Sequence, residues 1–172
     1  MAQPYSSNKP PASTTSVMNR GFKPYPQRQV MGELGTNTLL PSILVVDDDP
    51  SVLEMLHDAL DLWGFDVFLA KNGREGLQVL ANQKVDGILV DMDMPVMDGL
   101  TMLDELRWLG YPTPVVIMSG GVKVLNQKQV KNEGAQGFMS KPFSLSFLRS
   151  VCETIFKNEG VDGRSAAHSH VA

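Results

Sequence analysis

The stretch ILVDMDMPVMDGL places three carboxylates, Asp91, Asp93 and Asp98, directly after an apolar run. A second apolar run, SILVV, is followed by the acidic pair Asp47 and Asp48. Carboxylates that lie close together repel one another and resist burial, so a group of opposite charge must offset them. Carboxylates at two strand ends suit a hard divalent cation that takes oxygen ligands, such as Mg²⁺. These residues therefore predict a metal site.

Two other polar groups follow apolar runs further along the chain. Ser119 ends the run VVIMS, and Lys141 comes directly after GFMS. If these runs are neighbouring parallel strands, their carboxyl ends lie at one edge of the sheet, where such sheets bind ligands. A carboxylate, a divalent cation, a lysine and a hydroxyl around one point are the groups needed for phosphoryl transfer to an aspartate. Asp91, Lys141 and Ser119 are therefore the candidate reactive centre.

Two further aspartates are better explained as helix caps. Asp49 precedes Pro50 and an amphipathic pattern that stops at Gly64, which is typical of an N-cap, a first-turn proline and a terminating glycine. Asp98 likewise stands just before a helical pattern. We expect both side chains to bond backbone N–H groups rather than a metal.

The segments that must position the polar groups alternate between apolar runs and helical patterns. Predicted strands cover residues 42–46, 65–70, 85–90, 114–119 and 137–140. Predicted helices cover residues 49–64, 73–82, 98–110, 124–134 and 144–156. Apolar runs without polar alternation, separated by helices, predict a five-stranded parallel sheet that is covered on both faces. The expected fold class is therefore α/β, with a doubly wound sheet.

The 172 residues and a 42% apolar content are enough for one domain with tails. Residues 1–40 carry four basic residues and one acidic residue and are rich in Pro, Ser, Thr and Asn, so they predict a disordered basic tail. Residues 41–157 form the predicted domain, which carries 10 basic and 16 acidic residues. Residues 158–172 predict a second disordered tail.

The expected location is the cytoplasm, without membrane contact. The single cysteine, Cys152, lies on the apolar stripe of the last helix and excludes an intrachain disulfide, as is typical of a reducing compartment. No apolar run reaches the length of a membrane span, and the N-terminus lacks the apolar core of a signal peptide. The net charge of −4 argues against a role in binding nucleic acid through its backbone.

Four motifs, LVVDDD, LVDMDMPVMDG, VVIMSGG and GFMSKPF, occur in order at the predicted strand ends. Together they resemble the response-regulator receiver domain of two-component signalling, over residues 42–157. The resemblance implies the flavodoxin-like (βα)5 fold of that family. It also implies that Asp91 is the phosphoacceptor and that the cofactor is Mg²⁺ or Mn²⁺.

The same resemblance implies roles for the other residues of the motifs. The carboxylates of Asp47 and Asp48 and the backbone carbonyl of Asp93 would bind the metal. Ser119 and Lys141 would contact the phosphoryl oxygens, and Phe138 would be the aromatic residue that rotates when the domain is phosphorylated.

The resemblance also implies the partners. The phosphodonor would be a histidine kinase or a histidine phosphotransfer protein, and the protein would be a self-catalysing phosphoacceptor rather than an enzyme for a separate substrate. Because only 15 residues follow residue 157, we expect a stand-alone regulator without an output domain. It would signal through a downstream protein or through self-association, at a face around Phe138 and the last helix, where Leu145, Phe147 and Val151 lie partly off the core.

Two alternatives remain at this point. The motif DMDMP is similar to the nucleophile motif D-x-D-x-[TV] of haloacid-dehalogenase-type phosphatases, although Pro95 occupies its fifth position. That family also needs acidic metal ligands after its lysine, and no acidic pair follows Lys141. The second alternative is a receiver-like scaffold that is never phosphorylated.

Overall fold

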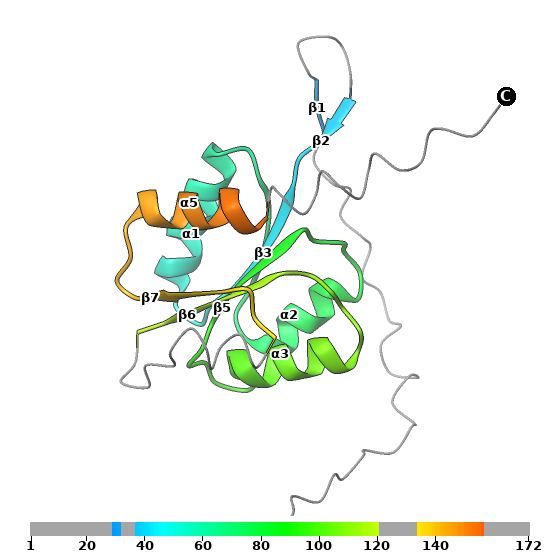
Figure 1. The fold of residues 1–172 in the computed structure, drawn as a ribbon, viewed down its shortest axis with the longest axis vertical. Helices are drawn as coiled ribbons and strands as arrows, with labels where there is room; N and C mark the ends of the chain where they lie inside the picture. Colours follow the sequence, from blue (N-terminus) through cyan, green and yellow to red (C-terminus); the bar gives the residue numbers. More distant parts are fainter. Residues whose placement is uncertain (1–28, 32–36, 121–133, 157–172) are drawn as a thin grey trace, which may run out of the picture.

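A five-stranded, all-parallel sheet forms the centre of the fold (Figure 1). The computed structural model describes residues 29–31, 37–120 and 134–156. The strands are β3 (Ser42–Val46), β4 (Asp66–Ala70), β5 (Gly87–Asp91), β6 (Val115–Ser119) and β7 (Gly137–Ser140), in the spatial order β4-β3-β5-β6-β7. The predicted fold class and the five predicted strands are confirmed, with strand ends that differ by up to two residues.

Helices cover both faces of this sheet, as the sequence predicted. The helices are α1 (Pro50–Leu62), α2 (Gly73–Leu80), α3 (Gly99–Trp108) and α5 (Leu145–Ile155). Helices α1 and α5 lie on one face, and α2 and α3 lie on the other (Figure 1). The predicted helix over residues 124–134 falls, except for its last residue, outside the described residues. None of the helices in the described part of the chain has the length and apolar character needed to cross a bilayer.

The central strands are apolar without alternation because both of their faces are buried. In β3, Ile43 and Val45 pack into the cluster beneath α1 and α5, whereas Leu44 and Val46 pack into the cluster beneath α2 and α3. All four side chains are fully buried. Burial of each such side chain stabilises the fold by about 1.5–3 kcal/mol relative to exposure, so these strands hold the sheet edge that carries the polar groups.

The predicted helix caps are confirmed. The Asp49 carboxylate accepts a hydrogen bond from the backbone N–H of Ser51 at 2.8 Å, and the Asp98 carboxylate accepts one from Thr101 at 2.7 Å. Gly64 follows α1 with a φ of +84°, a left-handed conformation that favours glycine. These caps fix where α1 and α3 begin, and both helices begin directly beside the acidic strand ends.

The predicted disorder of residues 1–40 is wrong for two short segments. Strands β1 (Gln29–Met31) and β2 (Asn37–Leu39) pair in antiparallel fashion, and they form a sheet separate from the central one. Three-residue strands need only backbone pairing and show no hydrophobic period, so composition alone does not reveal them. The rest of residues 1–36, and residues 158–172, lie outside the described residues.

Candidate functional site

The four predicted polar groups converge on one edge of the sheet. Asp47 follows β3, Asp91 ends β5, Ser119 ends β6, and Lys141 follows β7. The four strands are neighbours in the order β3-β5-β6-β7, and Ser119 pairs with Ser140, which precedes Lys141. The parallel topology therefore brings together side chains that lie up to 94 positions apart in the chain.

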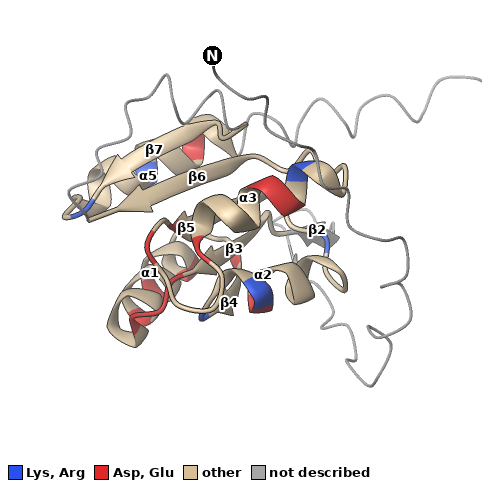
Figure 2. Cartoon of the chain, turned by 90° about the horizontal axis from the view of Figure 1, so that it is seen from below, with Lys and Arg blue, Asp and Glu red and all other residues tan. Residues whose placement is uncertain are grey.

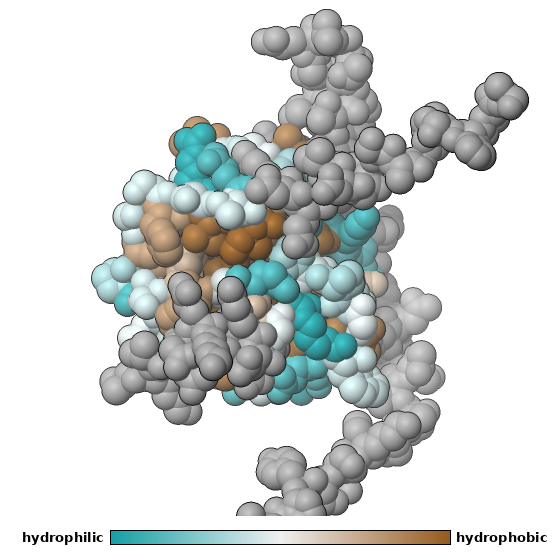
Figure 3. All heavy atoms as spheres, in the orientation of Figure 1, coloured by the Kyte–Doolittle hydropathy of each residue, from teal (hydrophilic) through white to brown (hydrophobic). Residues whose placement is uncertain are grey.

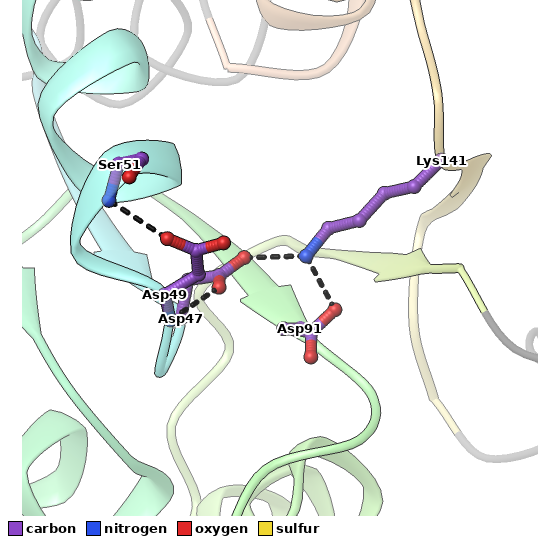
Figure 4. A network of polar contacts seen from close by, with 5 residues as sticks. All are labelled: Asp47, Asp49, Ser51, Asp91 and Lys141. Atoms are coloured by element: carbon purple, nitrogen blue, oxygen red, sulfur yellow. Dashed lines mark hydrogen bonds and ion pairs between the residues drawn. The ribbon is translucent and has the colours of Figure 1, made fainter.

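Lys141 bridges two of the carboxylates. Its Nζ atom lies 2.6 Å from Oδ2 of Asp47 and 2.7 Å from Oδ1 of Asp91 (Figure 4). The side chain of Lys141 is 23% exposed, while Asp47 and Asp91 are almost fully buried. The ammonium group therefore offsets much of the repulsion between these two carboxylates, through charge-assisted hydrogen bonds.

Burial raises the pKa of the Asp91 carboxyl, and this effect outweighs the opposite effect of Lys141. Burial alone would lower the pKa of Lys141, but the hydrogen bonds and charges of Asp47 and Asp91 together raise it. The lysine is thus held in its charged form, whereas the negative charge on Asp91 remains costly. An additional cation beside Asp91 would stabilise that charge.

A third carboxylate completes a possible metal site. Asp48 is exposed, and one carboxylate oxygen from each of Asp47, Asp48 and Asp91 lies within 4.8 Å of the others. Figure 2 shows acidic segments, in red, close to α1 and β5. Three carboxylates without nitrogen or sulfur ligands fit a hard cation such as Mg²⁺ or Mn²⁺.

The remaining predicted residues lie around this centre. Asp93 is exposed, and its backbone N–H forms a hydrogen bond with the Asp91 carboxylate. Ser119 is buried, and its backbone carbonyl accepts a hydrogen bond from the N–H of Lys141 at 2.7 Å. Phe138 is half-buried against the cluster beneath α2 and α3, opposite Ile117 in β6.

The loop from Asp91 to α3 contains two features that the sequence analysis missed. A side chain on Gly99 would collide with the backbone oxygen of Asp91, so only glycine fits there. Val96 has a φ of +71°, and the N–H of Met97 donates to the carbonyl of Pro95 at 2.8 Å, which together define a strained γ-turn. The Asp-Gly pair at the start of α3 could have indicated the need for glycine at position 99. Nothing in the sequence indicated the left-handed conformation of Val96.

Comparison with known proteins identifies the family that shares this arrangement. The sequence profile of the response regulator receiver domain matches residues 43–153. The chain belongs to this family. A receiver domain is the phosphoacceptor module of two-component signalling, and this membership decides against the phosphatase alternative.

Curated relatives support the receiver assignment. The chain is 32% identical over 136 residues to the transcriptional regulatory protein PrrA of Mycobacterium tuberculosis, covering 79% of the chain and 58% of PrrA. It is 33% identical over 135 residues to the regulatory protein AtoC of Escherichia coli, covering 78% of the chain and 29% of AtoC. The chain therefore spans only part of the length of these relatives.

Solved receiver structures share the fold. The receiver domain of the Francisella response regulator 1452 superposes with a TM-score of 0.65 at 29% identity, covering 69% of this chain and 98% of that one. The chemotaxis protein CheY4 of Vibrio cholerae gives a TM-score of 0.63 at 29% identity, covering 67% and 98%. The receiver domain described above is thus the part of the chain that these structures match.

Proposed function

We propose that Asp91 accepts a phosphoryl group from a phosphohistidine of a histidine kinase or phosphotransfer protein in the cytoplasm. We also propose that the protein signals through phosphorylation-dependent protein contacts. The observation that carries the first proposal is the position of Lys141, whose ammonium group lies within 2.7 Å of a carboxylate oxygen on both Asp47 and Asp91.

In the transfer step, a carboxylate oxygen of Asp91 forms a bond to phosphorus, and the bond between phosphorus and the donor imidazole nitrogen breaks. The electron pair of the broken bond stays on the imidazole, which takes up a proton, and Asp91 becomes an acyl phosphate. Lys141 would then bind a phosphoryl oxygen in place of the Asp91 carboxylate oxygen, and the Ser119 hydroxyl would donate to another.

The carboxylates of Asp47, Asp48 and Asp91 would hold a Mg²⁺ or Mn²⁺ ion, together with the backbone carbonyl of Asp93. When bound, this cation neutralises charge on the phosphoryl oxygens. The burial of Asp47 and Asp91 and the exposure of Asp48 support this set, because a ligand on the solvent side leaves a path for the ion.

Read-out would depend on Ser119 and Phe138. A phosphoryl group adds about 1.5 to 2 negative charges and strong acceptor oxygens, so the Ser119 hydroxyl would gain a charge-assisted hydrogen bond in the phosphorylated state. Movement of Ser119 toward that group would let Phe138 rotate into the vacated space. Phe138 is suited to this role because it is only half-buried and lies on the strand next to that of Ser119.

The proposed contact surface includes α5 beside β7. Leu145 and Phe147 are 46% and 49% exposed on this helix, while Val151 is half-buried. Figure 3 shows apolar side chains gathered next to α5 on the face drawn there. A downstream protein or a second copy of the chain would cover these side chains when the domain is phosphorylated.

The test is intact-protein mass spectrometry after incubation with acetyl phosphate, with Mg²⁺ or with EDTA. A single phosphoryl adduct that requires Mg²⁺ would support the receiver function. Turnover of a phosphomonoester without an adduct would instead indicate a phosphatase, and the absence of both would indicate an unphosphorylated scaffold.

A further inference from the structure

Arg107, in the last turn of α3, holds together two chain segments that are distant in sequence. Its guanidinium group donates to the carbonyl oxygens of Tyr111 at 2.7 Å, Thr113 at 3.1 Å and Gly134 at 2.9 Å. Its Nε atom donates a second bond to Gly134 at 3.1 Å. All of these acceptors are neutral, and no ion pair among the described residues involves Arg107. The half-buried charge is therefore satisfied by three backbone carbonyls and one side-chain amide oxygen.

That amide belongs to Gln136, which joins the starts of β6 and β7. Its Oε1 atom accepts bonds from Arg107 at 3.2 Å and from the backbone N–H of Val115 at 2.7 Å. The backbone N–H of Gln136 donates to the backbone carbonyl of Val115 at 2.8 Å. Because Phe138 is only two residues further along, Arg107 and Gln136 fix the start of the strand that carries it.

The opposite end of α3 touches the phosphoacceptor loop. Gly99, the first residue of α3, packs directly against the backbone oxygen of Asp91, and its N–H donates to the carbonyl of Met92 at 3.1 Å. Helix α3 thus extends from Asp91, at the carboxyl ends of the strands, to the start of β7, at their amino ends. Arg107 is the side chain that makes the second of these two connections.

We infer that Arg107 is a positioning residue, which ties the start of β7 to the helix that begins at Asp91 and thereby sets how strongly a change at Asp91 reaches Phe138. This inference rests on the proposed read-out through Phe138. The connection runs through α3 and is separate from the direct neighbour contact between Ser119 and β7.

The planar guanidinium group is needed because it presents several donors in a fixed arrangement, which a lysine cannot reproduce. In Arg107→Lys, a single ammonium group would reach only some of the four acceptors. The start of β7 would then move independently of α3, while the carboxylates and Lys141 at the other edge would keep their positions. Loss of coupling without loss of phosphorylation is the expected signature.

The experiment compares the unmodified chain with Arg107→Lys and Gln136→Leu, using amide chemical shifts before and after addition of beryllofluoride and Mg²⁺. In both variants the induced shift changes at Gly137–Ser140 should fall by about twofold or more. The changes at residues 91–93 and the labelling by acetyl phosphate should remain as in the unmodified chain. Arg74→Lys, an exposed arginine on α2, is the matched control and should keep the full response.

A purely structural role would lower the melting temperature of Arg107→Lys but leave the shift changes in β7 intact, and this result would overturn the inference alone. If the unmodified chain labels at Asp91 but shows no change in β7, the proposed read-out fails and the role of Arg107 fails with it. Gln136→Leu keeps the test decisive if Arg107→Lys folds poorly, because it removes one acceptor and leaves the arginine in place.

Discussion

Nζ of Lys141 lies 2.7 Å from Oδ1 of Asp91, although 50 positions separate the two residues in the chain. The same ammonium group also bonds Asp47, so one lysine offsets two buried carboxylates. A lysine in this position stabilises the two buried carboxylates when no metal is bound, and in the proposed function it would also provide a cation for the oxygens of an incoming phosphoryl group. The two roles can be separated by experiment.

Substitution Lys141→Met should lower the free energy of unfolding in EDTA by about 3 kcal/mol, because it leaves Asp47 and Asp91 buried without a cation. Addition of Mg²⁺ should then stabilise the variant more than the unmodified chain, and labelling by acetyl phosphate should fall. Urea denaturation with and without Mg²⁺ measures the first two effects. Lys71→Met, at an exposed lysine, is the control, and equal Mg²⁺ stabilisation of Lys141→Met and the unmodified chain would refute the explanation.

The neighbouring aspartates Asp48 and Asp49 should behave differently. Asp48→Ala should weaken Mg²⁺ binding by about tenfold or more, because it removes a proposed ligand. Asp49→Ala should leave Mg²⁺ affinity unchanged but lower stability by about 1 kcal/mol, because it removes the cap on the Ser51 N–H. Calorimetric titration of both variants with Mg²⁺ checks this, and an unchanged affinity in Asp48→Ala would remove Asp48 from the site.

Val96→Gly should raise the free energy of unfolding by about 1 kcal/mol, since glycine adopts a positive φ without strain whereas a β-branched residue does not. The side chain of Val96 is 73% exposed, so little buried apolar surface is lost. Val96→Ala keeps the Cβ atom and should give no comparable gain. Thermal and urea denaturation of the three proteins measure the effect, and a less stable glycine variant would show that the turn carries no strain.

A chain that starts at residue 40 should fold and be phosphorylated like the full chain. The truncation removes β1 and β2, which pair only with each other among the strands of the structure. Its melting temperature should therefore stay within a few degrees of that of the full chain. A large drop would mean that the N-terminal segment packs on the domain.

The convergence of Asp47, Asp91 and Lys141 could be predicted because one rule, that parallel strands end at the same edge, places every strand end. The caps Asp49 and Asp98 could be predicted because they depend only on local sequence. Arg107 could not, because all but one of its acceptors are backbone carbonyls, up to 27 positions away, and any residue type supplies a carbonyl. Val96 could not, because its left-handed φ is imposed by the surrounding fold against its own preference.

The most direct test of the central claim is to locate the phosphoryl group. Asp91→Asn and Asp93→Asn are matched variants, since each replaces one carboxylate of the same loop by an amide. After incubation with acetyl phosphate and Mg²⁺, peptide mass spectrometry should find the group on Asp91 in the unmodified chain and in Asp93→Asn, and no adduct in Asp91→Asn. Undiminished labelling of Asp91→Asn, mapped to another residue, would contradict the assignment.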